Sequence, residues 1–104
     1  MTHALKTWPE FYEQVEKGLK TFELRKNDRN YKLGDDLILQ EYNPEKKEYT
    51  GKEWKGTISY VFDNETFGLK KGFILLGIKE KENNYWKQVE EQSSELASKI
   101  EKLN

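Results

Sequence analysis

The sequence contains no cysteine and a single histidine among its 104 residues. Disulfides and thiolate metal sites are therefore excluded, and a metal site built on the histidine would need several carboxylates. We expect neither a metal nor a cofactor. The chain also lacks a run of about 18 apolar residues that could span a membrane, and its start lacks the apolar segment of a secretory signal. The composition predicts a soluble, cytoplasmic protein with no membrane partner.

An excess of charge of one sign is also missing. Charged residues make up 36 % of the chain, but 18 Lys and Arg against 19 Asp and Glu leave a net charge of -1. No global positive field attracts nucleic acid, so any such binding must come from a local patch. A chain of this length has room for one domain and a small appendage.

Turn-forming and apolar residues predict one helix and several strands in the first 80 residues. The pair Trp8-Pro9 predicts a helix over Pro9–Lys17, with Thr7 as its cap and Gly18 as its stop. Extended segments are expected over Ala4–Lys6, Thr21–Lys26, Asp36–Tyr42, Glu48–Phe62 with a bulge near Gly56, and Phe73–Ile78. These segments indicate an α+β fold in which strands predominate.

The composition changes after Glu80. Apolar residues recur every three or four positions over Tyr85–Leu103, which predicts an amphipathic helix. We divide the chain into a main domain, residues 1–82, and a C-terminal helix, residues 83–104, that packs on it. The stripe is short for a coiled coil, so a monomer is expected, with self-association through this helix as the alternative.

The most informative segment is the octapeptide Gly18–Arg25. Side chains alternate between the two faces of a strand, so Phe22 and Leu24 are expected to face the core while Glu23 and Arg25 share the other face. Lys20 lies at the preceding turn and supplies a second cation next to the carboxylate.

Two interpretations of these three charges stay open. One is an exposed ion-pair cluster worth about 0–1 kcal/mol per pair. The other is a ligand site, in which Arg25 offers two parallel donors to a phosphate or a base edge, Lys20 supplies a point charge, and Glu23 holds both cations in position.

The octapeptide has the form G-x-K-x-x-E-x-R and resembles the ASCH family (activating signal cointegrator homology), a branch of the PUA-like β-barrels. The similarity runs from His3 to about Lys79 through further blocks: His3-x-Leu5-Lys6, Trp8-Pro9-Glu10, Arg25–Arg29, Gly34-Asp35, Gln40–Tyr42, Tyr49–Gly51 and Phe67–Gly72. The resemblance implies a PUA-like mixed β-barrel with a flanking N-terminal helix and an added C-terminal helix. It also favours the ligand-site interpretation of the three charges, and we predict that the ligand is RNA or a modified nucleobase.

On this reading, the ligand site is a cleft formed by Lys20, Glu23 and Arg25, with Lys6, Arg29 and His3 at its rim. Aromatic side chains that could stack on bases lie nearby in the sequence: Trp8, Tyr31, Tyr42, Tyr49 and Trp54. Aromatic residues in strands are more often part of the core, so we expect at least three of these five rings to be largely buried.

Three other functions remain as alternatives. Some ASCH proteins are amidohydrolases that deacetylate N4-acetylcytidine with a motif lysine, a hydroxyl residue three positions later and a distant glutamate. Lys20 matches the lysine, but Glu23 stands at the hydroxyl position and only Glu65 is a candidate for the glutamate, so we expect no such turnover. An ASCH-type ribonuclease would use Lys20 and Glu23 as phosphate stabiliser and base. A protein-interaction module would use the C-terminal helix.

Overall fold

The computed structural model describes residues 1–81, which form one five-stranded sheet, one short α-helix and a turn of 3-10 helix. In chain order the elements are β1 (Thr2–Thr7), α1 (Pro9–Glu16), β2 (Phe22–Lys26), β3 (Asp36–Asn43), β4 (Glu48–Phe62), the 3-10 turn (Glu65–Phe67) and β5 (Phe73–Glu80). The predicted C-terminal helix and its packing lie outside the described residues. Among residues 1–81, no helix is both long and apolar enough to cross a membrane.

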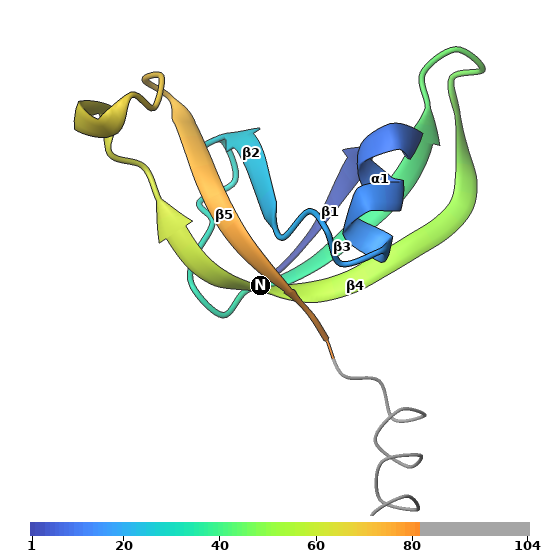
Figure 1. Ribbon diagram of the computed structural model, residues 1–104, viewed down its shortest axis with the longest axis horizontal. Helices are drawn as coiled ribbons and strands as arrows, with labels where there is room; N and C mark the ends of the chain where they lie inside the picture. The colour runs from blue at the N-terminus through green and yellow to red at the C-terminus, as the bar shows by residue number, and fades with distance from the viewer. Residues whose placement is uncertain (82–104) are drawn as a thin grey trace, which may run out of the picture.

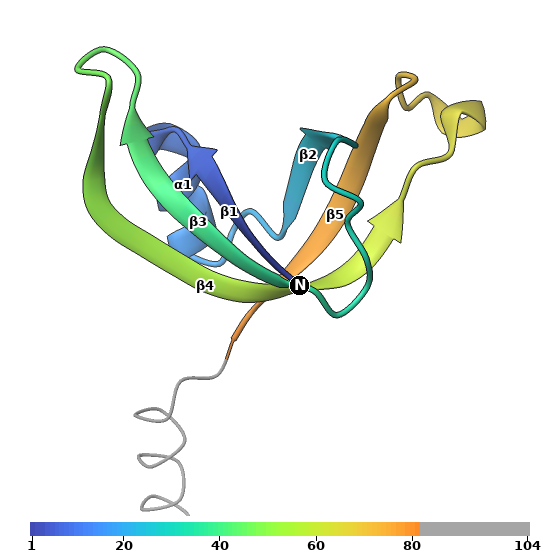
Figure 2. The same ribbon diagram turned by 180° about the vertical axis from the view of Figure 1, so that it is seen from behind.

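The sheet is mixed and strongly curled. Its strand order is β1-β3-β4-β5-β2, with β1 parallel to β3 and all other neighbours antiparallel. The 15-residue strand β4 pairs with β3 along its first part and with β5 along its last part. The bend of β4 between these two partners turns the sheet into a half-barrel, with α1 lying near β1 and β3 (Figure 1, Figure 2). The predicted mixed sheet with one flanking helix is confirmed.

The start and stop of α1 follow from local sequence. Pro9 occupies the first helical turn, and the carbonyl of the extended residue Trp8 accepts hydrogen bonds from the backbone N–H groups of Phe11 and Tyr12. Gly18 adopts φ +77° just after the helix, a left-handed conformation that glycine adopts readily. The predicted cap was wrong, because no side chain caps α1 and Thr7 is the last residue of β1.

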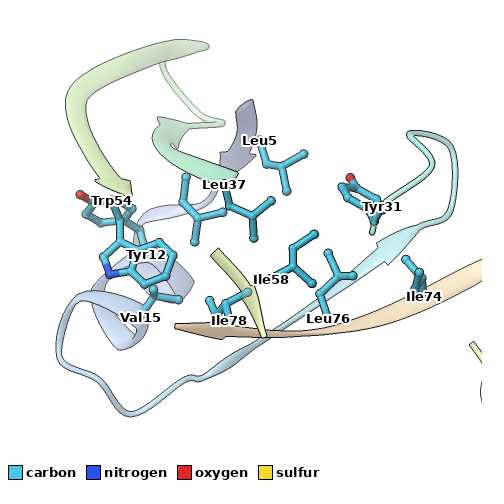
Figure 3. Packing of buried hydrophobic residues seen from close by; sticks show 11 residues of the cluster. Leu5, Tyr12, Val15, Tyr31, Leu37, Trp54, Ile58, Ile74, Leu76 and Ile78 are labelled. Atoms are coloured by element: carbon cyan, nitrogen blue, oxygen red, sulfur yellow. The ribbon is translucent and has the colours of Figure 1, made fainter. Parts of the chain in front are cut away.

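The core fills the concave side of the half-barrel. Trp54, Tyr12 and Val15 gather at one end of it, and Tyr31 and Ile74 lie toward the other (Figure 3). The remaining members come from β1, β3, β4 and β5: Leu5, Leu37, Leu39, Ile58, Leu76 and Ile78. Four strands, one helix and the segment between β2 and β3 therefore share a single small core.

Gly56 makes room for the largest core side chain. A Cβ atom at this position would overlap the ring of Trp54 and the carbonyl oxygen of Lys79. The irregularity predicted near Gly56 lies shortly after it, because the register of β4 against β5 shifts between Ile58 and Tyr60. A second register shift lies opposite Gln40–Tyr42 of β3.

The two faces of β2 are reversed relative to the prediction. Phe22 and Leu24 are 47 % and 53 % exposed, whereas Glu23 is 3 % exposed. Glu23 and Arg25 do share a face, as predicted, but that face is the inner one, where Glu23 pairs opposite the core residue Leu76. The inner face of this edge strand can hold Glu23 because Lys20 and Arg25 pair with its carboxylate.

Candidate functional site

Two arginine side chains connect the free edges of the half-barrel. β1 and β2 are the two end strands of the sheet, and we call the gap between them the seam. Arg25 Nη2 on β2 donates to the carbonyl oxygen of Lys6 at 2.9 Å and lies 3.4 Å from Thr7 Oγ1, both on β1. Arg29 Nη1 donates to the carbonyl oxygen of Ala4 at 2.8 Å. Side-chain donors therefore satisfy backbone carbonyls at an edge where no strand of residues 1–81 pairs.

A buried carboxylate organises the β2 side of the seam. Lys20 Nζ lies 2.6 Å from Glu23 Oε1 and 2.7 Å from the carbonyl oxygen of Phe22. Arg25 approaches Glu23 Oε2 through Nε at 3.0 Å and Nη2 at 2.9 Å. Each oxygen of the carboxylate thus has its own cation, which is how proteins tolerate a buried charge. The interpretation as an exposed surface cluster does not fit Glu23.

A pocket of about 420 Å³ opens beside this network. Residues from the end of β1, from α1 and from β2 line it: Lys6, Thr7, Trp8, Phe11, Lys20, Phe22, Glu23, Leu24 and Arg25. Its volume falls in the range of about 300–1,000 Å³ that is typical of small-molecule sites. Most of its surface is apolar, because Trp8, Phe11, Phe22 and Leu24 are each about half exposed. Large apolar side chains left open beside convergent polar groups are the usual composition of a ligand site.

The aromatic rings and cations of the pocket lie close to one another. The rings of Trp8 and Phe11 are nearly parallel, with centroids 6.4 Å apart and an interplanar angle of 21°. Lys20 Nζ lies 5.0 Å from the centroid of the Phe22 ring and 6.0 Å from that of Phe11. The lining contains three cations and one carboxylate, a local formal charge of +2 in a chain of net charge -1. The pocket is therefore a local positive patch with aromatic walls.

Four of the six predicted ligand residues line this pocket: Lys6, Lys20, Glu23 and Arg25. Arg29 lies along the seam but does not line the pocket, since its guanidinium bonds Ala4. His3 is buried, with Nε2 2.8 Å from Asp35 Oδ2 and its ring 4.7 Å from that of Tyr31. The structure therefore places His3 inside the fold and not at the rim of the pocket.

The surroundings of His3 shift the pKa of two neighbours. The hydrogen bond from His3 holds the pKa of Asp35 below its ordinary value, with the backbone N–H of Lys32 and the chain N-terminus contributing. Burial raises the pKa of Tyr31, and the charge of Arg29 opposes this change. Asp35 therefore favours its charged form and ties β1 to the loop before β3.

The five candidate stacking rings divide between core and surface. Tyr31 and Trp54 are buried and Tyr42 is largely buried, as predicted for at least three of them. Trp8 and Tyr49 are each 50 % exposed. Trp8 lines the pocket, and Tyr49 lies on β4 with its ring edge-on to that of Tyr42.

Sequence reasoning missed several pocket residues. Phe11 was not singled out, and Phe22 and Leu24 were assigned to the core, although all three line the pocket. Thr7 was assigned to the helix cap, yet it follows the alternation of buried residues along β1 and turns inward. That alternation was the signal that could have predicted an inward-facing Thr7. Within residues 1–81, no three His, Asp or Glu side chains converge as a metal site would require.

A family model matches most of this domain, and one phage protein resembles part of the chain. The sequence model described as "Domain of unknown function (DUF3850)" matches residues 2–78, a range that includes the seam and the pocket. A protein of Escherichia phage P2, described as "Uncharacterized 12.9 kDa protein in GpA 3'region", is 38 % identical over 61 residues. This match covers 59 % of the chain and 54 % of the phage protein, so the chain spans about half the length of that relative. Because the family model covers most of the sequence, the chain belongs to the family described as Domain of unknown function (DUF3850).

Proposed function

We propose that this chain is an ASCH-type, PUA-like domain that binds RNA or a modified nucleobase in the pocket beside the seam. One observation carries the proposal: half-exposed aromatic side chains line a pocket whose polar end is the buried carboxylate of Glu23, paired with Lys20 and Arg25. The G-x-K-x-x-E-x-R motif, which suggested the family, supplies that network.

The pocket combines the two kinds of group that a nucleobase requires. A base has apolar faces that stack on aromatic rings and a polar edge that forms hydrogen bonds. Trp8, Phe11 and Phe22 provide the rings. At the polar end, Lys20 has one N–H group beyond those directed at Glu23 and Phe22, and Arg25 Nη1 meets no acceptor among residues 1–81. These remaining donors are available to a base edge or a phosphate.

The sequence suggested that Arg25 offers two parallel donors to the ligand, but the structure leads us to propose a different role for it. Its Nε and Nη2 atoms already contact Glu23 and β1, so the guanidinium does not offer both of its parallel donors to a ligand. We therefore assign to Arg25 the positioning of the pocket edge and a single contact through Nη1. Lys20 and Lys6 supply the remaining positive charge.

The contacts of Glu23 favour binding over catalysis. In the amidohydrolase or ribonuclease alternatives, a carboxylate would have to accept a proton from water or from a hydroxyl group. Both oxygens of Glu23 accept from cations, and the residue is 3 % exposed. The interaction-module alternative rests on residues 83–104, which lie outside the described residues.

Fluorescence anisotropy with short labelled RNAs tests the proposal. Phe11→Ala removes a pocket wall and should weaken binding, because stacking contributes roughly 1–3 kcal/mol per base. Phe67→Ala is the matched control, since Phe67 is 77 % exposed and lies outside the pocket. Three cations predict a modest salt dependence, about 0.7 per phosphate contact on a single strand. Equal effects of the two substitutions, or no binding by the wild type, would overturn the proposal.

A further inference from the structure

We propose a second base-binding position on the outer side of the sheet, formed by the ring of Tyr49 and linked to the pocket by Lys6. The preferred ligand is then a single strand of at least two nucleotides, and a free base or mononucleotide binds more weakly. This inference rests on the proposed function and specifies its substrate class.

The Tyr49 ring is held in place and half open. Tyr42 on β3 and Tyr49 on β4 are directly paired across the hairpin, and their rings meet edge-on with centroids 5.1 Å apart and an interplanar angle of 67°. Tyr42 is largely buried, whereas Tyr49 is 50 % exposed. A fixed aromatic ring that keeps contact with solvent is a platform on which a base can stack at low entropic cost.

Lys6 connects this ring to the pocket. Lys6 is one of the residues lining the pocket, and its Nζ lies 4.5 Å from the centroid of the Tyr42 ring and 5.8 Å from that of Tyr49. The ammonium thus lies at the tyrosine pair, on a residue that also borders the pocket. In the proposed complex it binds the phosphate that joins the two stacked bases. Cations interleaved with aromatic rings are the arrangement by which proteins hold single-stranded nucleic acid.

A purely structural role of the Tyr42–Tyr49 pair would not require the neighbouring ammonium of Lys6. A cross-strand tyrosine pair stabilises a hairpin through ring contact alone, and that role would need no exposed cation beside it. Tyr60 provides the comparison within the same strand. It is 64 % exposed, yet among residues 1–81 no ammonium lies over its ring. Tyr60 is therefore the matched control for Tyr49.

The experiment is a competition assay with a labelled random-sequence RNA octamer. The competitors are unlabelled random tetramers and an equimolar mixture of the four nucleoside monophosphates. We expect tetramers to compete at lower concentration than monophosphates. Tyr49→Ala should weaken tetramer binding about 5- to 150-fold, the equivalent of roughly 1–3 kcal/mol for one stacked base. It should leave monophosphate binding unchanged. Tyr49→Phe, which keeps the ring, should behave as the wild type, and Tyr60→Ala should change neither competitor.

The outcomes separate this inference from the proposed function. If tetramers and monophosphates competed at equal concentrations, or if Tyr49→Ala and Tyr60→Ala had equal effects, the proposal of a second base-binding position would be overturned. Binding that still depends on Phe11 would then leave the pocket as the only site. No binding of the octamer would overturn both.

Discussion

Replacing Glu23 by glutamine tests whether the buried carboxylate holds the seam together. Glutamine keeps nearly the same shape, so the substitution removes the negative charge between Lys20 and Arg25 without opening a cavity. Removing one partner of a buried ion pair costs about 3–5 kcal/mol. The Lys20 and Arg25 side chains are 17 % and 24 % exposed, so water screens part of their repulsion and we expect a loss of about 2–3 kcal/mol. In a domain of this size that lowers Tm by roughly 10–20 °C.

The measurement is thermal and urea unfolding followed by circular dichroism. Glu13→Gln is the matched control, because Glu13 pairs with Lys17 at 2.9 Å on the surface of α1, where both side chains are more than half exposed. The control should change stability only marginally, since exposed pairs contribute little. If Glu23→Gln were no more destabilising than Glu13→Gln, the carboxylate would not organise the seam.

Three further substitutions test other parts of the account. Arg25→Lys keeps the charge but loses the donor that reaches the Lys6 carbonyl, so urea unfolding should show a loss of about 1–2 kcal/mol, and no change would mean that the bond contributes nothing. Gly56→Ala places a methyl group against Trp54 and should cost about 1–3 kcal/mol or more, whereas wild-type stability would contradict the packing described. The lowered pKa of Asp35 gives stability that is present above its unfolded value of about 3.9 and is lost as pH falls through the folded value. Asp35→Asn should therefore flatten the acid side of the pH–stability profile, and an unchanged profile would contradict this assignment.

The helix and strands could be predicted because their signals are local. Pro9 and Gly18 mark the ends of α1, and apolar runs such as Ile74–Ile78 mark strands, without reference to the rest of the chain. The curl of the sheet has no such signal. It arises because β4 exchanges β3 for β5 as its partner, and this pairing connects segments far apart in the sequence.

The charged site was predictable in part. The spacing of Glu23 and Arg25 places them on one strand face, and the structure brings Lys20 to the same carboxylate. The inward direction of that face was not predictable, because an alternation of apolar and charged residues ordinarily places the apolar ones inside. His3 was misplaced for a related reason. Its partner Asp35 is 32 positions away, so the buried pair is invisible in the local pattern.

The central claim is that RNA occupies the pocket, and the indole N–H signals of the tryptophans test it most directly. The chain has three tryptophans. Trp8 lines the pocket and is half exposed, whereas Trp54 is buried in the core. Titration of 15N-labelled protein with a short RNA, with Trp8→Phe to assign the signal, should shift the Trp8 indole resonance to saturation and leave that of Trp54 in place. An unmoved Trp8 signal under conditions where RNA is bound, or no bound RNA at all, would contradict the claim.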